Sequence, residues 1–406
     1  MNILAFNILN IAFLFVLVFT SIHPTLGQED VVFVTITVTA TSTTSRSPSP
    51  TVSPRCSTLA VRKEFRQLSN QERNEFLSAL RAVNSATRPN RLDSMSYYHL
   101  QATRNAHGQA QFFPWHRLFL REFERALQTI NPRVTLPYWY WGEDADNPAY
   151  SQIFSNQWYG GTGTCINTGQ IAYWNVLYNR DGSARLHCLP RQFNRGNFIS
   201  PWASTEVLQN ILLTRNTFDE FRTALEGSPH GNVHITIGGD MGTMASPNDP
   251  IFFMHHCFLD KLWMDWQNRG PQFESQFNGV NKDGSQASIT EVLYPYRVQV
   301  QSMMSTQNPG LCYTYSDYIP QLSKRANLTS TKIKCAKPNT PSPPTPRRKI
   351  LPVPQPLPDA WLEMNGLNAS RVRQEERRMA KFISRYNYNV TANLPLRLDD
   401  TVPLLE

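Results

Sequence analysis

The chain has 406 residues, of which 40% are hydrophobic and 11% aromatic, so it can bury a sizeable core and global disorder is excluded. Charged residues make up 17%, below the usual share of about 25%, which argues against a coiled coil. The net charge is +8 and no block of five or more basic residues occurs, so the composition favours a basic surface over nucleic-acid binding.

The N-terminal residues are expected to lie outside the folded core. An apolar, uncharged run from Ile8 to Phe19 is too short for a membrane span, and small residues follow it. Residues 1–27 are therefore interpreted as a secretory signal peptide cut before Gln28, with an uncleaved anchor as the alternative. Residues 28–55 follow as a spacer rich in Ser, Thr and Pro. No other stretch is expected to enter a bilayer, so the mature protein should be exported.

Residues 56–323 form the dense segment in which a core domain is expected. The spacing of apolar residues there predicts helices over 70–83, 114–130, 217–225 and 250–266. Ser69 and Asp249 are the expected N-caps of the first and the last of these helices. Long loops such as 156–194 lie between them. The expected fold is mainly α: a helical bundle with long loops and few short strands.

The C-terminal part is expected to be a linker and a tail. Nine prolines fall between Pro338 and Pro358, which makes residues 324–358 an extended linker. The basic triplet Arg347–Lys349 inside it is a candidate processing site, or simply a charged part of the linker. Residues 359–406 form the tail, in which 368–386 has the pattern of an amphipathic basic helix.

Histidines carry the chemical information in this sequence. Eight of the nine follow the signal peptide, and seven of these eight form two clusters, with His187 apart; the clustered residues are His99, His107, His116, His230, His234, His255 and His256. His230 and His234 are four apart, so on a helix both rings project from one face.

A third ligand for the second cluster is expected from the helix that contains His255 and His256. Adjacent residues are about 100° apart on a helix, so only one of the two is expected to point inward. Asp260 lies four residues after His256 and is expected to accept a hydrogen bond from its second ring nitrogen. His256 is therefore the predicted ligand, and His255 its neighbour.

Two sets of three neutral imidazoles predict a two-metal site, because one catalytic zinc needs only three histidines. Imidazole suits Zn, Cu, Fe and Ni, and a pair of coppers that binds O2 fits such a site. Aromatic residues around the clusters, among them Phe252, would keep it dry. The alternative interpretation is a set of hydrogen-bonded core histidines.

Two motifs resemble those of a known family. The run AHGQAQFFPWHRLFLREFERAL (Ala106–Leu127) resembles the first copper motif of the tyrosinase, catechol oxidase and molluscan hemocyanin family. The runs HGNVH and NDPIFFMHHCFLDKLW resemble its second copper motif. The resemblance covers about Cys56 to Tyr315. It implies a helical bundle around two type 3 coppers, CuA held by His99, His107 and His116, and CuB held by His230, His234 and His256.

The resemblance also points to residues near the reacting phenol. Glu226 resembles the glutamate that orders a water in the family, and its alternative role is pairing at a helix end. Relatives that hydroxylate monophenols often carry an asparagine where this chain has Gly231, and Asn232 is displaced by one position. Met244, with Thr243 next, is the expected counterpart of the gate residue, with ordinary loop packing as the alternative. His255 is also expected at the entrance.

Cysteines and glycosylation acceptors fit an oxidising compartment. Six cysteines allow fifteen pairings, and the hypothesis adopted here joins Cys56 to Cys312 and Cys165 to Cys188. Cys257 is then a buried free thiol and Cys335 is left over. The N-x-S/T acceptors are Asn327, Asn368 and Asn389.

The resemblance implies a secreted copper-dependent polyphenol oxidase that converts catechols to o-quinones with O2, with weak monophenol hydroxylation, and feeds melanin-like pigment or crosslinking. The alternative is a hemocyanin-like oxygen-binding protein without turnover. The expected partners are a small phenol and a protease that cuts at Arg347–Lys349, with no nucleic acid and no stable membrane association after signal cleavage. In relatives a C-terminal segment often covers the site until proteolysis; a flexible glycosylated tail is the alternative for this chain.

Overall fold

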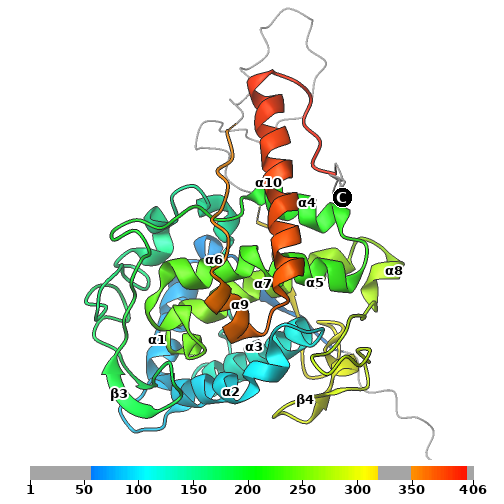
Figure 1. Ribbon diagram of the computed structural model, residues 1–406. Coiled ribbons are helices and arrows are strands. Elements are labelled where there is room, and N and C mark those ends of the chain that lie inside the picture. Colours follow the sequence, from blue (N-terminus) through cyan, green and yellow to red (C-terminus); the bar gives the residue numbers. More distant parts are fainter. Residues whose placement is uncertain (1–55, 319–348, 400–406) are drawn as a thin grey trace, which may run out of the picture. The chain divides into compact units, whose positions relative to one another are not determined.

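The computed structural model describes residues 56–318 and 349–399 (Figure 1). The predicted signal peptide and spacer, most of the linker, Asn327 and Cys335 lie outside the described residues. The described part is mainly helical with a few short strands, so the predicted fold class is confirmed.

The helices are α1 (Asn70–Val83), α2 (Arg91–Ala106), α3 (Phe112–Gln128), α4 (Thr205–Thr214), α5 (Phe218–Glu226), α6 (Ser228–Ile237), α7 (Ile251–Gln267), α8 (Pro271–Glu274), α9 (Asp359–Asn365) and α10 (Ala369–Thr391). The strands are β1 (Ala60–Arg62), β2 (Asn175–Tyr178), β3 (Ala184–Cys188), β4 (Val292–Leu293), β5 (Val298–Gln299) and β6 (Tyr313–Tyr315). None of the described helices is both long enough and apolar enough to cross a membrane.

The predicted helix starts are close to those of the structure. The side chain of Ser69 accepts a hydrogen bond from the Glu72 amide and caps α1, as predicted. α3 begins at Phe112, two residues before the predicted start, because a proline inside the first turn removes an N–H that has no helical partner there. α7 begins at Ile251, so Pro250 is its N-cap in place of the predicted Asp249, one residue later than expected. The Asp249 carboxylate still accepts a hydrogen bond from the Ile251 amide at 3.1 Å.

Several elements were not predicted, among them α4, α8 and α9. The loop 156–194 contains the antiparallel hairpin of β2 and β3, which the disulfide Cys165–Cys188 fastens.

The two ends of the core domain lie side by side. β1 pairs with β6 in parallel, with Ala60 opposite Tyr313, and the Cys56–Cys312 disulfide joins the chain next to this pair. Both hypothesised disulfides are therefore confirmed, and Cys257 is buried and free as predicted.

α3 and α7 form the centre of the bundle, and aromatic rings fill the space between them. Phe123 and Phe253 stack with centroids 3.5 Å apart, and Phe113 lies 5.4 Å from Trp263. Large buried rings of this kind contribute much of a core's stability. They also fix α3 and α7 so that one histidine of each faces the other.

A buried network of charged residues and tyrosines is centred on Asp260 of α7. The Asp260 carboxylate accepts a hydrogen bond from Arg117 Nε at 2.6 Å and another from the Tyr315 hydroxyl at 2.7 Å. The side chains of Arg117 and Asp260 are 0% and 3% exposed, so neither charge is screened by water.

We expect Asp260→Asn to destabilise the fold by about 3–5 kcal/mol, because it leaves the Arg117 charge buried without its counter-ion. Denaturant unfolding of the metal-free protein measures this loss. Asp265→Asn is the matched control: it removes the more exposed partner of Lys261 on the same helix and should cost at most about 1 kcal/mol. Equal losses in the two variants would contradict a structural role for the buried network.

The C-terminal residues pack on the core domain instead of forming a free tail. Met379, Phe382, Ile383 and Tyr386 of α10 belong to the main hydrophobic core. Glu375 pairs with Arg215 of the core at 2.6 Å. The helix predicted over 368–386 is thus confirmed as α10, whereas the flexible-tail alternative is wrong for residues 349–399.

The predicted linker also ends earlier than expected. Leu351 and Leu357, which the sequence analysis placed in an extended linker up to residue 358, are buried. The signal for an open linker was the proline content, but proline also suits an extended segment that lies along a surface. Residues 349–366, including α9, are called the strap below.

Candidate metal centre

The structure brings the seven clustered histidines into two buried groups. His99 comes from α2, His107 follows its last residue, and His116 lies in the first turns of α3. The second group consists of His230 and His234 of α6 with His255 and His256 of α7. In each group, one ligand atom from every histidine lies within 4.8 Å of the others.

Backbone carbonyls orient most of these rings through Nδ1. The contacts are His99 to Met244 O (2.7 Å), His107 to Thr103 O (3.3 Å), His116 to Phe112 O (2.8 Å), His230 to Glu226 O (3.0 Å) and His234 to Met241 O (2.8 Å). A carbonyl can only accept, so each Nδ1 carries the proton and the lone pair is on Nε2. This is the tautomer that a metal ion needs.

Three of these lone pairs have no partner within the described residues. Nε2 of His99, His116 and His230 is buried and has no hydrogen-bond partner among the described residues. Nε2 of His234 lies 3.3 Å from Nε2 of His256, whose ring is not oriented by a backbone carbonyl. Buried polar atoms are rarely left unpaired, because the loss of hydration costs free energy. Metal ions bound at these atoms would supply the missing partners.

Burial also keeps the rings neutral. It lowers the pKa of His99 to about 4 and that of His230 to about 3. The pKa of His107, His116, His234 and His256 lies well below the usual value for the same cause. Neutral imidazole is the form that binds metal, so the groups are ready for it at neutral pH.

The expected contact between His256 and Asp260 is not formed. Asp260 accepts hydrogen bonds from Arg117 and from the hydroxyls of Tyr313 and Tyr315 in β6. His256 Nδ1 has no partner in the described part of the chain. A buried carboxylate gains more from a guanidinium than from a neutral ring, because only the guanidinium balances its charge.

The expectation that only one of the two adjacent histidines points inward is also wrong. α7 is buried along its whole first half, so both rings lie inside. His256 stacks on His116 of the other group at 4.2 Å, and His255 stacks on His230 at 5.4 Å. Phe252, expected beside the site, lies 4.2 Å from the His256 ring.

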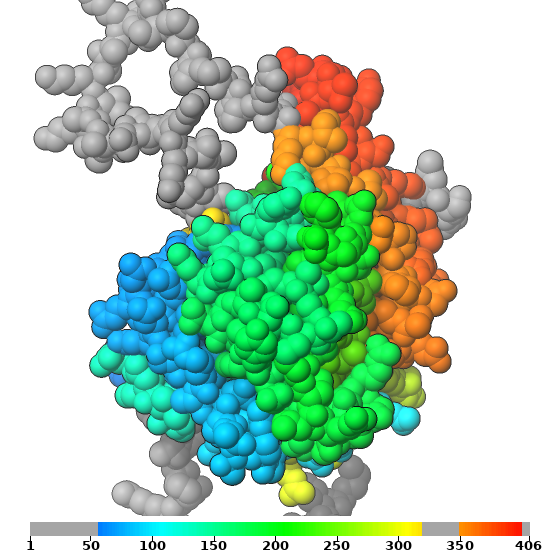
Figure 2. Space-filling view, turned by 90° about the vertical axis from the view of Figure 1, so that its left-hand side faces the viewer, coloured from blue at the N-terminus to red at the C-terminus, as the bar shows by residue number. Residues whose placement is uncertain are grey.

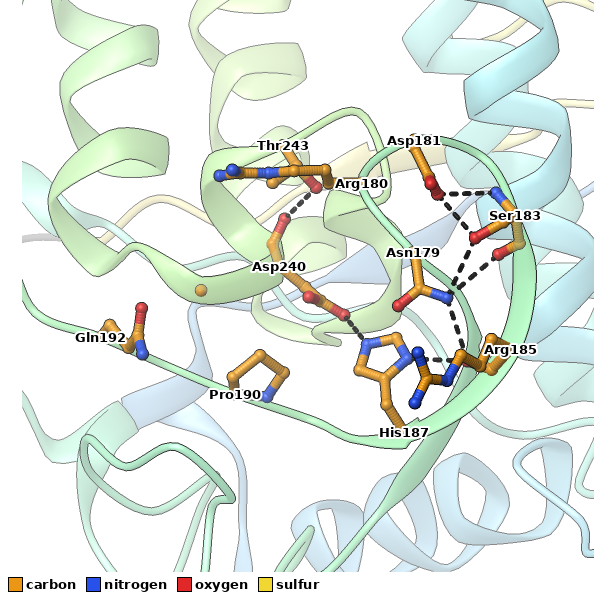
Figure 3. Close-up of a pocket in the computed structure, with 11 residues that line it drawn as sticks. Asn179, Arg180, Asp181, Ser183, Arg185, His187, Pro190, Gln192, Asp240 and Thr243 are labelled. Atoms are coloured by element: carbon orange, nitrogen blue, oxygen red, sulfur yellow. Dashed lines mark hydrogen bonds and ion pairs between the residues drawn. The ribbon is translucent and has the colours of Figure 1, made fainter.

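His187 stays outside both groups, as predicted. It lies in β3 and is hydrogen-bonded to the Asp240 carboxylate at 2.9 Å, which raises its pKa (Figure 3). These two residues line a surface pocket of about 620 Å³.

Two expected entrance residues have other contacts. Thr243 lines the same surface pocket, and its hydroxyl donates to the Asp240 carbonyl. Met244 is buried, and its backbone carbonyl orients His99. The assignment of a gate to either side chain stays a prediction.

Glu226 is the last residue of α5 and is fully buried. Its carboxylate accepts a hydrogen bond from the Gly108 amide at 2.5 Å and is paired with Arg222. Burial raises the pKa of Glu226, and the Arg222 charge opposes that rise. The carboxylate thus links the turn after His107 to the corner before His230, and this contact favours the pairing alternative.

The strap covers the second histidine group (Figure 2 shows it in orange beside the green core). The Trp361 ring lies 5.5 Å from His234 and 6.5 Å from His230, and its Nε1 has no partner among the residues described. A Cβ at Gly231 would come within 2.8 Å of both Leu357 and Trp361. Asn232 Nδ2 donates to the Gln355 carbonyl at 3.0 Å. Gly231 and Asn232 thus contact the chain's own strap, and their place at a substrate entrance stays a prediction.

The family model named "Common central domain of tyrosinase" matches residues 89–269, which hold both histidine groups. A tyrosinase of Streptomyces antibioticus is 34% identical over 243 residues, which cover 52% of this chain and 85% of that protein. Tyrosinase ustQ of Aspergillus flavus is 30% identical over 296 residues, covering 65% of this chain and 82% of that protein. A solved polyphenol oxidase variant of Thermothelomyces thermophila matches with a TM-score of 0.58 and 25% identity, covering 65% of this chain and 91% of that one.

Proposed function

The chain belongs to the tyrosinase family of type 3 copper oxidases, and from this premise we propose that it is a secreted enzyme that oxidises catechols to o-quinones with O2. The observation that carries the proposal is the pair of buried histidine groups, in which three Nε2 lone pairs have no partner among the described residues. The two disulfides in the described chain support an oxidising compartment.

Two copper ions fit these groups. His99, His107 and His116 would hold one, and His230, His234 and His256 the other; His255 is a further candidate beside the second group. Bound copper supplies O2 binding and takes up the electrons of the catechol. The protein's own residues hold five of these rings by backbone carbonyls and exclude water with aromatic side chains such as Phe112 and Phe252.

An oxygen-uptake assay on copper-loaded protein, with one catechol and one monophenol, tests this proposal. Turnover of the catechol supports it. Reversible oxygen binding without turnover would instead favour the hemocyanin-like alternative. Melanin-like pigment or crosslinking is the proposed fate of the quinone.

Monophenol hydroxylation is proposed to be weak, because a phenol with a pKa near 10 must reach copper as phenolate. Glu226 is the candidate base. We expect Glu226→Gln to lower monophenol turnover more than catechol turnover if it acts as a base. Equal loss of both, together with lower copper content, would assign it to positioning His107 and His230 instead. Initial rates on tyramine and dopamine, with metal analysis, separate the two outcomes.

Gly231→Asn is expected to raise the ratio of monophenol to catechol turnover, because its amide would help orient the water that deprotonates the phenol. Any side chain at 231 also collides with Leu357 and Trp361, so it displaces the strap as well. Gly231→Ala is therefore the matched control: it pushes the strap without adding an amide. If the two variants show the same ratio, the amide has no role at this position.

We propose further that the enzyme is latent in this form, because the strap fills the approach to the second group. A cut in the linker at Arg347–Lys349 would leave the strap attached to α10, which is part of the core. Release of the site therefore needs movement of the strap itself.

A further inference from the structure

The strap is held through its backbone as well as by its apolar side chains. Glu376 Oε1 accepts a hydrogen bond from the Leu357 amide at 2.8 Å, and Arg373 donates to the Leu357 carbonyl at 2.7 Å. On the other side, Asn232 donates to the Gln355 carbonyl at 3.0 Å. These hydrogen bonds are made to backbone N–H and C=O groups, which every polypeptide has.

The groups that hold the strap lie on two neighbouring helices. Asn232 is on α6, which is buried in the core, and Arg373 and Glu376 are on α10. The later apolar residues of α10, from Met379 on, belong to the main core, whereas Val372 packs with the strap. Arg373 and Glu376 are also paired with each other at 2.7 Å. A segment that replaces the strap would therefore meet these hydrogen-bonding groups between α6 and α10. This place, which the strap occupies, is called the groove below.

The groove ends in a slot for an aromatic ring. Trp361 occupies this slot against His230 and His234, with Gly231 as its floor. The slot lies four residues beyond Leu357, where the backbone contacts are made. A chain held at the position of Leu357 therefore delivers the ring of a later residue to the histidines.

We propose that this groove is a binding site for polypeptide substrates: a segment with a phenol or catechol side chain binds where the strap lies, extended at the position of Leu357 and helical after it as in α9, and places its ring where Trp361 lies. The chemistry rests on the proposed oxidase function. Each peptide-borne catechol loses two protons and two electrons to become an o-quinone, and each O2 that oxidises a pair of them becomes two waters.

The test uses a full chain in which residues 355–365 are replaced by Gly/Ser of equal length, so that α10 stays attached. The probe is a fluorescent peptide of the sequence 351–366, and binding is measured by anisotropy without turnover. We expect saturable binding that weakens at least about tenfold in Arg373→Ala. Arg377→Ala, which alters an exposed residue of the same helix, is the matched control and should bind as before.

The peptide itself offers a second control. An N-methyl group on the amide of the residue at 357 removes the donor to Glu376 and should weaken binding about tenfold. The same group at exposed Val353 should leave binding unchanged. Equal effects at the two positions, or no saturable binding, would overturn the proposal. A milder variant, Leu357→Ser with Trp361→Ser, serves where circular dichroism shows that the longer replacement is unfolded.

Turnover separates this inference from the oxidase function. With dihydroxyphenylalanine in place of Trp361, the peptide should show a KM at least about tenfold below that of N-acetyl-dihydroxyphenylalanine amide. Similar KM values for the two catechols would contradict the peptide-binding proposal and leave the proposed oxidase function unaffected. A third outcome is that neither catechol is oxidised, while the peptide still binds and Arg373→Ala weakens its binding. That outcome would support the peptide-binding groove and contradict the proposed oxidase function.

Discussion

Replacing His234 by alanine is expected to lower the copper content of the loaded protein to about half or less and to abolish catechol oxidation. The two groups contain three and four histidines, and no described Cys, Asp or Glu belongs to either group as a further metal ligand. Metal analysis and oxygen uptake measure the two effects. Copper should also raise the melting temperature of the wild type, because a ligand that binds only the folded state stabilises it, and this shift should shrink in the variant.

His187→Ala is the control for this experiment, since His187 is a histidine outside both groups. It should keep its full copper content and its activity on small catechols. Full copper content in His234→Ala would remove the assignment of the second group. One zinc and no copper in the wild type would remove the proposed function altogether.

Trp361→Ala is expected to raise kcat/KM for a catechol by about 10–100-fold. Losing a large buried side chain weakens the closed strap by about 1.5–3 kcal/mol, and the population of the open form rises by the corresponding factor. Bulky catechols should gain more than small ones, because they need a wider opening. Steady-state rates with two catechols of different size measure the effect.

Tyr388→Ala is the matched control, because it removes an exposed aromatic ring of α10 that is far from the slot in sequence. It should leave the rates unchanged. A cut at Arg348 should activate less than Trp361→Ala, because α10 keeps the strap in place. Full activation by the cut alone would show that the strap leaves together with α10.

The histidine groups could be predicted because their information is local. The spacing of His230 and His234 places two rings on one helical face whatever surrounds the helix. Helix caps such as Ser69 are equally local, since donor and acceptor are three residues apart.

The failures come from partners that are distant in sequence. Asp260 is hydrogen-bonded to Arg117, which lies 143 residues away in the sequence, and no local sequence pattern predicts that contact. The inward position of His255 follows from burial of α7 on all sides, which depends on every neighbouring element. The strap gave a misleading local signal, because its prolines indicated an extended chain but not the surface that Trp361 reaches.

The position of the strap in the chain also imposes an order in time. All histidines of the two groups precede it, and Trp361 follows His256 by roughly 100 residues, which at ribosomal rates of about 5–20 residues per second is an interval of about 5–20 s. During that interval the groups have no cover. Metal that arrives then meets an open site, whereas metal that arrives later must wait for the cover to open. Copper should therefore enter chains that are still being synthesised faster than it enters finished ones, and pulse-labelled synthesis with and without copper would show the difference.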